Sequence, residues 1–125
     1  KKTEVVNSAT DNESVKHGKW ISYSESGENT AEENYKDGML NGKTLYYLPG
    51  EVLVAQEVNY LNGKLHGRNV SYDKSGRMVS DINYKNGRLD GDYIIYDSRG
   101  KKTLHVVYKD GKKEKEIVNV KSGNK

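Results

Sequence analysis

Three histidines, His17, His66 and His105, are the side chains of this sequence best suited to binding a metal or moving a proton. A zinc site requires several such ligands close together, and the chain has no cysteine to supply thiolates. His17 and His66 occupy the same place in an internal repeat, two copies apart, which corresponds to about 19 Å across neighbouring strands. We therefore expect no metal site.

The adjacent carboxylates Glu32 and Glu33 are the next arrangement with catalytic capacity, because paired acids can act as general acid and base. Most carboxylates of the chain fall in turns or at exposed strand positions, so we interpret this pair as part of a solvated face. No serine, histidine and aspartate follow a pattern typical of nucleophilic catalysis, and no glycine-rich loop leads from a strand into a helix. The sequence predicts no catalytic residues, no cofactor and no enzyme activity.

Large side chains at positions that vary between the repeats form a candidate interaction patch. These residues are Trp20, Tyr46, Tyr93 and Ile95. We predict that they lie on the strand face opposite Ile94 and Tyr96, where exposed aromatic residues favour an interface. The alternative is that they pack against the N-terminal segment or the curled sheet itself.

Charge is divided unevenly along the chain. Residues 1–62 hold 6 Lys and Arg against 10 Asp and Glu, a net charge of −4, and residues 63–125 hold 15 against 8, a net charge of +7. A candidate basic patch near the last hairpin consists of Arg99, Lys101, Lys102, Lys109, Lys112, Lys113 and Lys115. Such a cluster suits nucleic acid, an anionic membrane or an acidic protein. The alternative is ordinary solubility, with lysines protecting a sheet edge.

The elements that must position these residues come from a repeat of 24 or 25 residues. Each copy starts at an anchor glycine: Gly18, Gly42, Gly67 or Gly91. An aliphatic residue follows three positions later and a tyrosine five positions later, so period-2 alternation predicts a strand. A second strand ends in the motif Tyr-x-[Asn/Asp]-Gly, as at Tyr84 to Gly87. Each copy is therefore predicted to be two short strands, about nine strands in all.

Two connections alternate along the chain. Within a repeat the turn contains a glycine: Asp97-Ser98-Arg99-Gly100 suits a type I turn with a glycine bulge, and Leu48-Pro49-Gly50-Glu51 favours type II. Between repeats the turn is a short hairpin signal such as Asn86-Gly87. Leu89 and Ile94 are five residues apart, so both can be buried only if the strand shifts frame. Gly91 is the natural place for such a bulge or bend.

The composition favours a thin, elongated fold. Only 33% of the residues are hydrophobic, with ten tyrosines and no phenylalanine, and a single-layer sheet needs less apolar material than a two-layer core. We predict an all-β chain, a single-layer antiparallel meander of tandem β-hairpin repeats, curled by strand twist. Residues 1–15 form a polar segment with an edge strand near Thr3 to Asn7, 16–111 four repeats, and 112–125 a degenerate half-repeat cap and tail.

The motif Tyr84-x-x-Gly87-x-x-x-Gly91, recurring with this period, resembles the MORN repeat, and specifically the variant common in bacterial repeat proteins. Some members of that group are labelled YwqK-type antitoxins. The resemblance covers Lys16 to about Gly111. MORN repeats usually have a second glycine two residues after the anchor, and here those positions hold Trp20, Thr44, Asn69 and Tyr93. The resemblance implies a curved sheet of hairpins used for binding or scaffolding, without catalytic residues.

These observations predict a non-catalytic scaffold whose partner is another protein, in an antitoxin-like role. Peripheral binding to anionic lipid through the basic C-terminal half is the alternative, and glycan binding by Trp20 and Tyr46 is a second one. Nucleic acid is disfavoured because Tyr96 and Tyr108 are both assigned to the packed face. No run of 18 apolar residues is present to span a membrane. The chain starts without methionine, and export with a removed signal peptide is one explanation that the sequence leaves open.

Overall fold

The computed structural model describes residues 2–6, 15–51 and 53–120, with side chains described for 15–51 and 53–120. These residues form one antiparallel sheet and no helix. The strands are β1 (Lys2–Val6), β2 (Gly18–Tyr23), β3 (Asn29–Lys36), β4 (Met39–Leu40), β5 (Gly42–Tyr47), β6 (Val54–Leu61), β7 (Lys64–Leu65), β8 (Gly67–Tyr72), β9 (Met78–Lys85), β10 (Arg88–Tyr96), β11 (Lys102–Lys109) and β12 (Lys112–Asn119).

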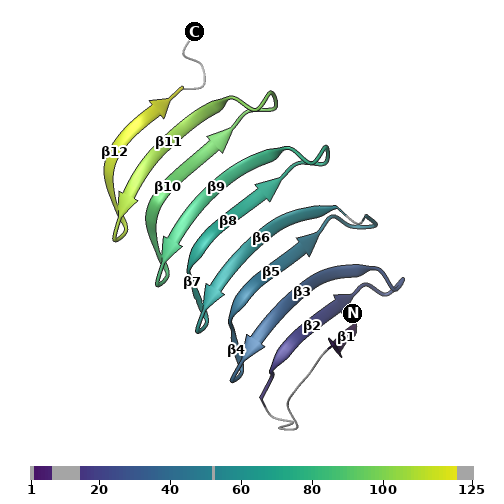
Figure 1. The fold of residues 1–125 in the computed structure, drawn as a ribbon. Coiled ribbons are helices and arrows are strands. Elements are labelled where there is room, and N and C mark those ends of the chain that lie inside the picture. Colours follow the sequence, from purple (N-terminus) through teal and green to yellow (C-terminus); the bar gives the residue numbers. More distant parts are fainter. Residues whose placement is uncertain (1, 7–14, 52, 121–125) are drawn as a thin grey trace.

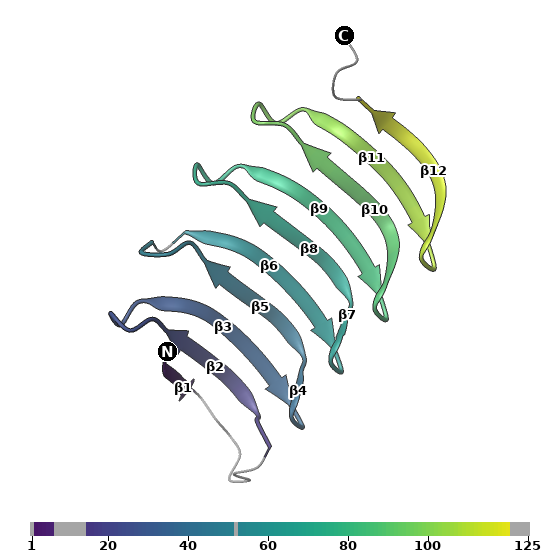
Figure 2. The same cartoon turned by 180° about the vertical axis from the view of Figure 1, so that it is seen from behind.

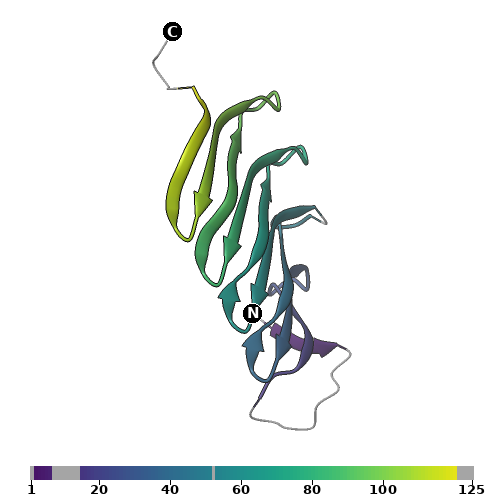
Figure 3. The same cartoon turned by 60° about the vertical axis from the view of Figure 1, so that its left-hand side comes forward.

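The sheet is a meander in which consecutive strands are neighbours. The order is β1-β2-β3-β5-β6-β8-β9-β10-β11-β12, and the two-residue strands β4 and β7 pair with β3 and β6. Figures 1 and 2 show the hairpins stacked along one direction, with β1 and β12 at opposite ends. Figure 3 shows the same stack as a single twisted layer. The predicted all-β hairpin meander is confirmed, with ten strands along the path in place of about nine.

The expected bulge is present at the anchor glycines, but it does not bring Leu89 and Ile94 to one face, because Leu89 pairs with Tyr84 on the face of Tyr93. The register between β9 and β10 shifts between Leu89 and Tyr93, and Gly91 has a φ of +104°. A Cβ at this position would lie 3.3 Å from Cβ of Asn83. Asn83 uses the space to donate a hydrogen bond to the backbone oxygen of Asp92 at 3.1 Å. Glycine is therefore required both by the backbone conformation and by the close approach of the neighbouring strand.

The turns also follow the sequence, and they divide the sheet into two edges. At one edge, Asp37, Asn62, Asn86 and Asp110 have positive φ and precede glycines that also have positive φ, as two-residue type I′ turns require. At the other edge, Gly100 donates to the backbone oxygen of Asp97 at 3.0 Å and has a φ of +85°. This is the expected type I turn with a glycine bulge. We call these the tight-turn edge and the wide-turn edge.

The core is split between the two faces of the sheet. Ala31, Val58 and Val106 are buried on one face, and Val70 and Ile94 on the other. Tyr93 lies opposite Val106 in the register, and Ile94 lies opposite His105. Tyr108 therefore shares a face with Tyr93, and not with Ile94 and Tyr96. The assignment of Tyr96 and Tyr108 to one packed face is wrong. The register between β10 and β11 places Tyr108 opposite Gly91, three residues from Ile94 along β10, so the two tyrosines of the repeat lie on opposite faces.

The two ends of the sheet are half-repeats. In β1, Glu4 pairs with Ile21, just as Asp81 of a return strand pairs with Ile94. At the other end of the sheet, Val118 of β12 pairs with His105 of β11 and is the one half-buried residue of β12. The predicted edge strand near Thr3 to Asn7 is present as β1. The predicted tail from 121 to 125 lies outside the described residues.

Candidate binding surface

One face of the sheet carries aromatic side chains in every repeat, and we call it the aromatic face. It holds Trp20, Tyr46, Tyr93 and Ile95 from the first strands of the repeats and Tyr35, Tyr60, Tyr84 and Tyr108 from the return strands. All eight are half-buried. No second layer of described chain covers this face, because residues 2–6, 15–51 and 53–120 form one sheet.

The four predicted patch residues share this face but do not form one cluster. Trp20 on β2 and Tyr93 on β10 are six strands apart in the order of the sheet, which corresponds to about 29 Å. Tyr46 lies about 10 Å from Trp20 by the same measure. The return-strand tyrosines fill the intervals. The aromatic surface is therefore a long band, and sequence reasoning missed half of it by placing the return-strand tyrosines on the other face.

The band is organised by ring pairs at its two ends. Tyr93 and Tyr108 have ring centroids 5.7 Å apart, and Trp20 and Tyr35 meet edge to face at 6.4 Å. The hydroxyl of Tyr35 donates to Oε1 of Glu33 at 3.1 Å. Burial, with the nearby Glu33 carboxylate, raises the pKa of Tyr35 to about 12, so this phenol is neutral over the physiological range. These contacts fix the rings while leaving part of each in solvent.

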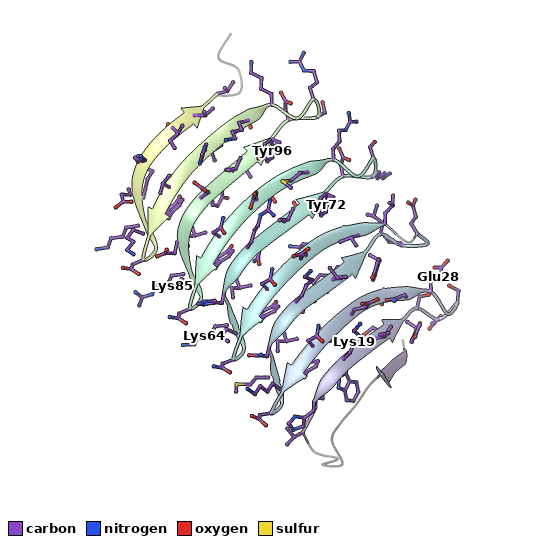
Figure 4. The ribbon with its side chains drawn as sticks, in the orientation of Figure 1. Lys19, Glu28, Lys64, Tyr72, Lys85 and Tyr96 are labelled. Carbon is purple, nitrogen blue, oxygen red and sulfur yellow. The ribbon has the colours of Figure 1, made fainter. Side chains whose placement is uncertain are left out.

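The predicted basic patch is divided between two edges of the sheet. Arg99, Lys101 and Lys102 lie at the wide-turn edge, whereas Lys109, Lys112, Lys113 and Lys115 lie at or near the tight-turn edge. Lys102 and Lys109 are the two ends of β11, which corresponds to about 23 Å. Figure 4 shows the separation of the edges, with Tyr72 and Tyr96 at the wide turns and Lys64 and Lys85 at the tight turns. The expectation of a single basic cluster at the last hairpin is wrong, because β11 separates residues that are close in sequence.

The histidines have structural partners. Nδ1 of His17 accepts from the backbone N–H of Asp37 at 3.4 Å, and Nδ1 of His66 accepts from that of Asn86 at 3.2 Å. Asn41 and Asp90 occupy the same slot in the other repeats and accept the corresponding bonds from the next tight turns. The slot therefore requires a side-chain acceptor, and histidine is one way to supply it.

The carboxylates form contacts between strands rather than a catalytic pair. Glu32 and Glu33 point to opposite faces, since they are adjacent on β3. On the face opposite the aromatic one, ion pairs recur at equivalent positions: Lys19 with Glu32, Lys43 with Glu57, and Arg68 with Asp81. In the fourth repeat the same two positions hold Asp92 and His105, which are hydrogen-bonded at 2.9 Å. Among the residues with described side chains, no group of three His, Cys, Asp or Glu is arranged to hold a metal ion.

Hollows on the described surface are open. One lies at the wide-turn edge between Glu28, Asn29, Tyr47, Gly50 and Glu51, with a volume of about 370 Å³. Another lies at the tight-turn edge, where Arg88, Lys109, Lys112 and Lys113 stand beside Asp110 and Glu114. Both are shallow and open to solvent, so neither resembles the enclosed pocket typical of a small-molecule site.

No protein-family model matches this chain, and no curated protein matches it either. Within the described residues, no helix is long and apolar enough to cross a membrane. The candidate site therefore depends on the geometry of the sheet. That geometry supplies an aromatic face that no second layer of the described residues covers.

Proposed function

We propose that this chain is a non-catalytic MORN-type scaffold that binds another protein through its aromatic face. The observation that carries the proposal is the uncovered band of half-buried aromatic rings on β2, β5, β10 and the return strands. Tyrosine and tryptophan are enriched where protein interfaces are strongest, because they bury large areas at a small cost in side-chain entropy. The band is long enough to receive an extended partner surface.

The resemblance to bacterial MORN-type repeats supports the same function. That group implies hairpin sheets used for binding or scaffolding, and some of its members are labelled antitoxins. An antitoxin-like role therefore predicts a dedicated partner that binds tightly and in a defined ratio. The observed arrangement suits this role because positions such as Trp20, Thr44, Asn69 and Tyr93 differ between repeats, which gives each repeat a distinct surface on a common frame.

The test is affinity capture from a lysate of the source cells with the native protein and two face variants. Tyr46→Ser introduces the residue found at this position in repeats one and three, and Tyr93→Thr introduces that of repeat two, so both fit the strand. Tyr72→Ser on the opposite face is the control. We expect one protein retained at high salt by the native chain and by the control, and reduced at least tenfold by the paired face substitutions. Equal retention by all variants would contradict binding through this face.

Anionic lipid is a second candidate, favoured by the hollow that Arg88, Lys109, Lys112 and Lys113 line at the tight-turn edge. Lysines near an anionic surface contribute about 1 kcal/mol each, and salt screens that attraction. Neutralising Lys112, Lys113 and Lys115 should then abolish sedimentation with vesicles that contain phosphatidylserine. Asp110 and Glu114 lie in the same hollow and weaken this candidate, so we rank it second. Glycan binding at Trp20 ranks third, because Nζ of Lys16 lies over that ring, 4.8 Å from its centroid.

A further inference from the structure

The first repeat departs from the others at two positions that meet in space. Lys16 stands two residues before its anchor glycine, where the other repeats have Leu40, Leu65 and Leu89. The backbone there is unchanged: the oxygen of Lys16 accepts from Gly38 N–H at 2.9 Å, as that of Leu40 accepts from Gly63 at 2.8 Å. The first repeat therefore places an ammonium group where the others place an apolar side chain.

The ammonium of Lys16 is held by two aromatic rings. Its Nζ lies 4.8 Å from the centroid of the Trp20 ring and 4.7 Å from that of the Tyr35 ring. The rings are inclined to each other by 78°, so they form two walls around one cation. We call this arrangement the Trp20–Tyr35 cage. Cation–π attraction of this kind extends to about 6 Å from the ring centroid, so both rings contribute.

The walls of the cage are held by groups other than Lys16. Nε1 of Trp20 donates to the backbone oxygen of His17 at 3.2 Å, and the Tyr35 hydroxyl donates to Glu33 at 3.1 Å. Both rings are half-buried, whereas Lys16 is exposed. The lysine can therefore leave without unpacking the sheet. Glu33 also adds negative charge, which favours a cation beside the rings.

The fourth repeat shows that ring pairing alone does not make such a cage. Tyr93 and Tyr108 occupy the places of Trp20 and Tyr35, with their centroids 5.7 Å apart, but Leu89 occupies the place of Lys16. The second and third repeats have Thr44 and Asn69 in place of Trp20. Among the described residues, the combination of two rings and a cation belongs to the first repeat.

We propose that the Trp20–Tyr35 cage is a binding site for an organic ammonium ion, with a quaternary ammonium group as the preferred ligand and Lys16 as a tethered occupant of the free protein. A quaternary ammonium has no N–H groups that need hydrogen-bond partners, so aromatic faces can replace the water around it. The ammonium of lysine is strongly hydrated, and holding it against the rings costs more. The site lies at one end of the aromatic face, but ammonium binding there does not rest on the protein-binding function proposed above.

The experiment uses the fluorescence of Trp20, which is the one tryptophan among 125 residues and a wall of the cage. The full chain is titrated with tetramethylammonium chloride and, separately, with sodium chloride at equal ionic strength. We expect a saturable change with tetramethylammonium only. Lys16→Ala should bind about two- to fivefold more tightly, because it removes a competitor whose contact has the strength of an exposed cation–π pair.

Two variants at one position provide the control. Tyr35→Leu removes one wall and should abolish saturation, whereas Tyr35→Phe keeps the ring and should retain it, with circular dichroism confirming that both fold. Identical responses to the two salts, unchanged affinity in Lys16→Ala, or saturation in Tyr35→Leu would each overturn the proposal. Choline and vesicles of phosphatidylcholine then distinguish the two sources: saturation by choline indicates a free ligand, and a response to vesicles at lower total choline indicates a lipid headgroup.

Discussion

Thr44 shows how a single residue can be poorly matched to its place in this thin sheet. Its side chain is 0% exposed, and its hydroxyl has no hydrogen-bond partner. A buried hydroxyl without a partner costs about 1–3 kcal/mol. Replacement by valine, which has the same shape, removes that cost. We expect Thr44→Val to raise the free energy of unfolding by about 1 kcal/mol, measured by urea denaturation.

Thr30 is the matched control for this prediction. Its Oγ1 donates to the backbone oxygen of Ser22 at 3.1 Å, so Thr30→Val removes a made hydrogen bond and should destabilise the protein. If both substitutions lowered stability equally, the hydroxyl of Thr44 would have a partner in solution and the prediction would be wrong.

Ionisation of Tyr35 makes the free energy of unfolding depend on pH in the alkaline range. The pKa of its phenol is about 12 in the folded protein, above the ordinary value of 10.0, mainly because of burial and then because of Glu33. The unfolded chain therefore loses this proton more readily than the folded one. The contribution to stability is complete below pH 10 and is lost as the pH rises from 10 towards 12.

The comparison that tests this is the native protein against Tyr35→Phe. Urea unfolding at pH 9 and pH 11 should show a larger loss of stability for the native protein, because the variant has no group to ionise at this position. The other tyrosines with a raised pKa, Tyr46, Tyr47 and Tyr84, are common to both proteins and cancel. Equal losses would show that Tyr35 ionises alike in the folded and unfolded chains.

At the scale of the hairpin, replacing a glycine can destabilise the protein in two ways: a side chain disfavours a positive φ, and its Cβ can clash with a neighbouring strand. Gly91 and Gly76 both have positive φ, +104° and +84°, but a Cβ at Gly91 would meet Asn83 at 3.3 Å while one at Gly76 would meet nothing within 4 Å. Gly76→Ala should therefore cost only the backbone term, about 1–2 kcal/mol. Gly91→Ala should cost about 1 kcal/mol more, because β9 must also move away. Thermal unfolding of the two variants in parallel tests the difference.

The turns and bulges of each hairpin could be predicted from sequence because glycine, asparagine and aspartate report backbone conformation directly. Asn86-Gly87 and Gly91 were identified in this way. The face of each side chain could not be predicted, because it depends on the register between strands. Ile94 and Tyr108 each follow a clear alternation within their own strand, but the register between β10 and β11, which sets Ile94 opposite His105, decides that they lie on opposite faces.

The Trp20–Tyr35 cage had a signal in the sequence. Lys16 stands where the other repeats have Leu40, Leu65 and Leu89, and Trp20 is the single tryptophan of the chain. Departures from a repeat indicate special sites better than the residues that repeat do. The basic patch had no comparable signal, because nearness along the chain says little about nearness in a sheet whose strands are about 25 Å long.

For the whole molecule, the absence of a second layer among the described residues makes each hairpin dependent on its two neighbours. Stability in such an array is approximately a sum of local terms, so opening can begin at an end without unfolding the centre. Among the strands whose side chains are described, β12 is the weakest by this argument, since seven of its eight residues are exposed and it has one neighbour. Its amides should exchange with solvent faster than those of β8 and β9.

The variant Val106→Ala tests whether a loss of stability in one strand stays confined to the neighbouring strands. Val106 is 4% exposed on β11, and loss of two methyl groups there should cost about 2 kcal/mol. If repeats interact only with their neighbours, exchange should accelerate more than tenfold in β10, β11 and β12 and remain unchanged in β2 and β3. Val58→Ala, at the same place in the second repeat, should move the accelerated region to β5, β6 and β8. Uniform acceleration along the chain for either variant would mean that the sheet unfolds as one cooperative unit and would contradict nearest-neighbour stability.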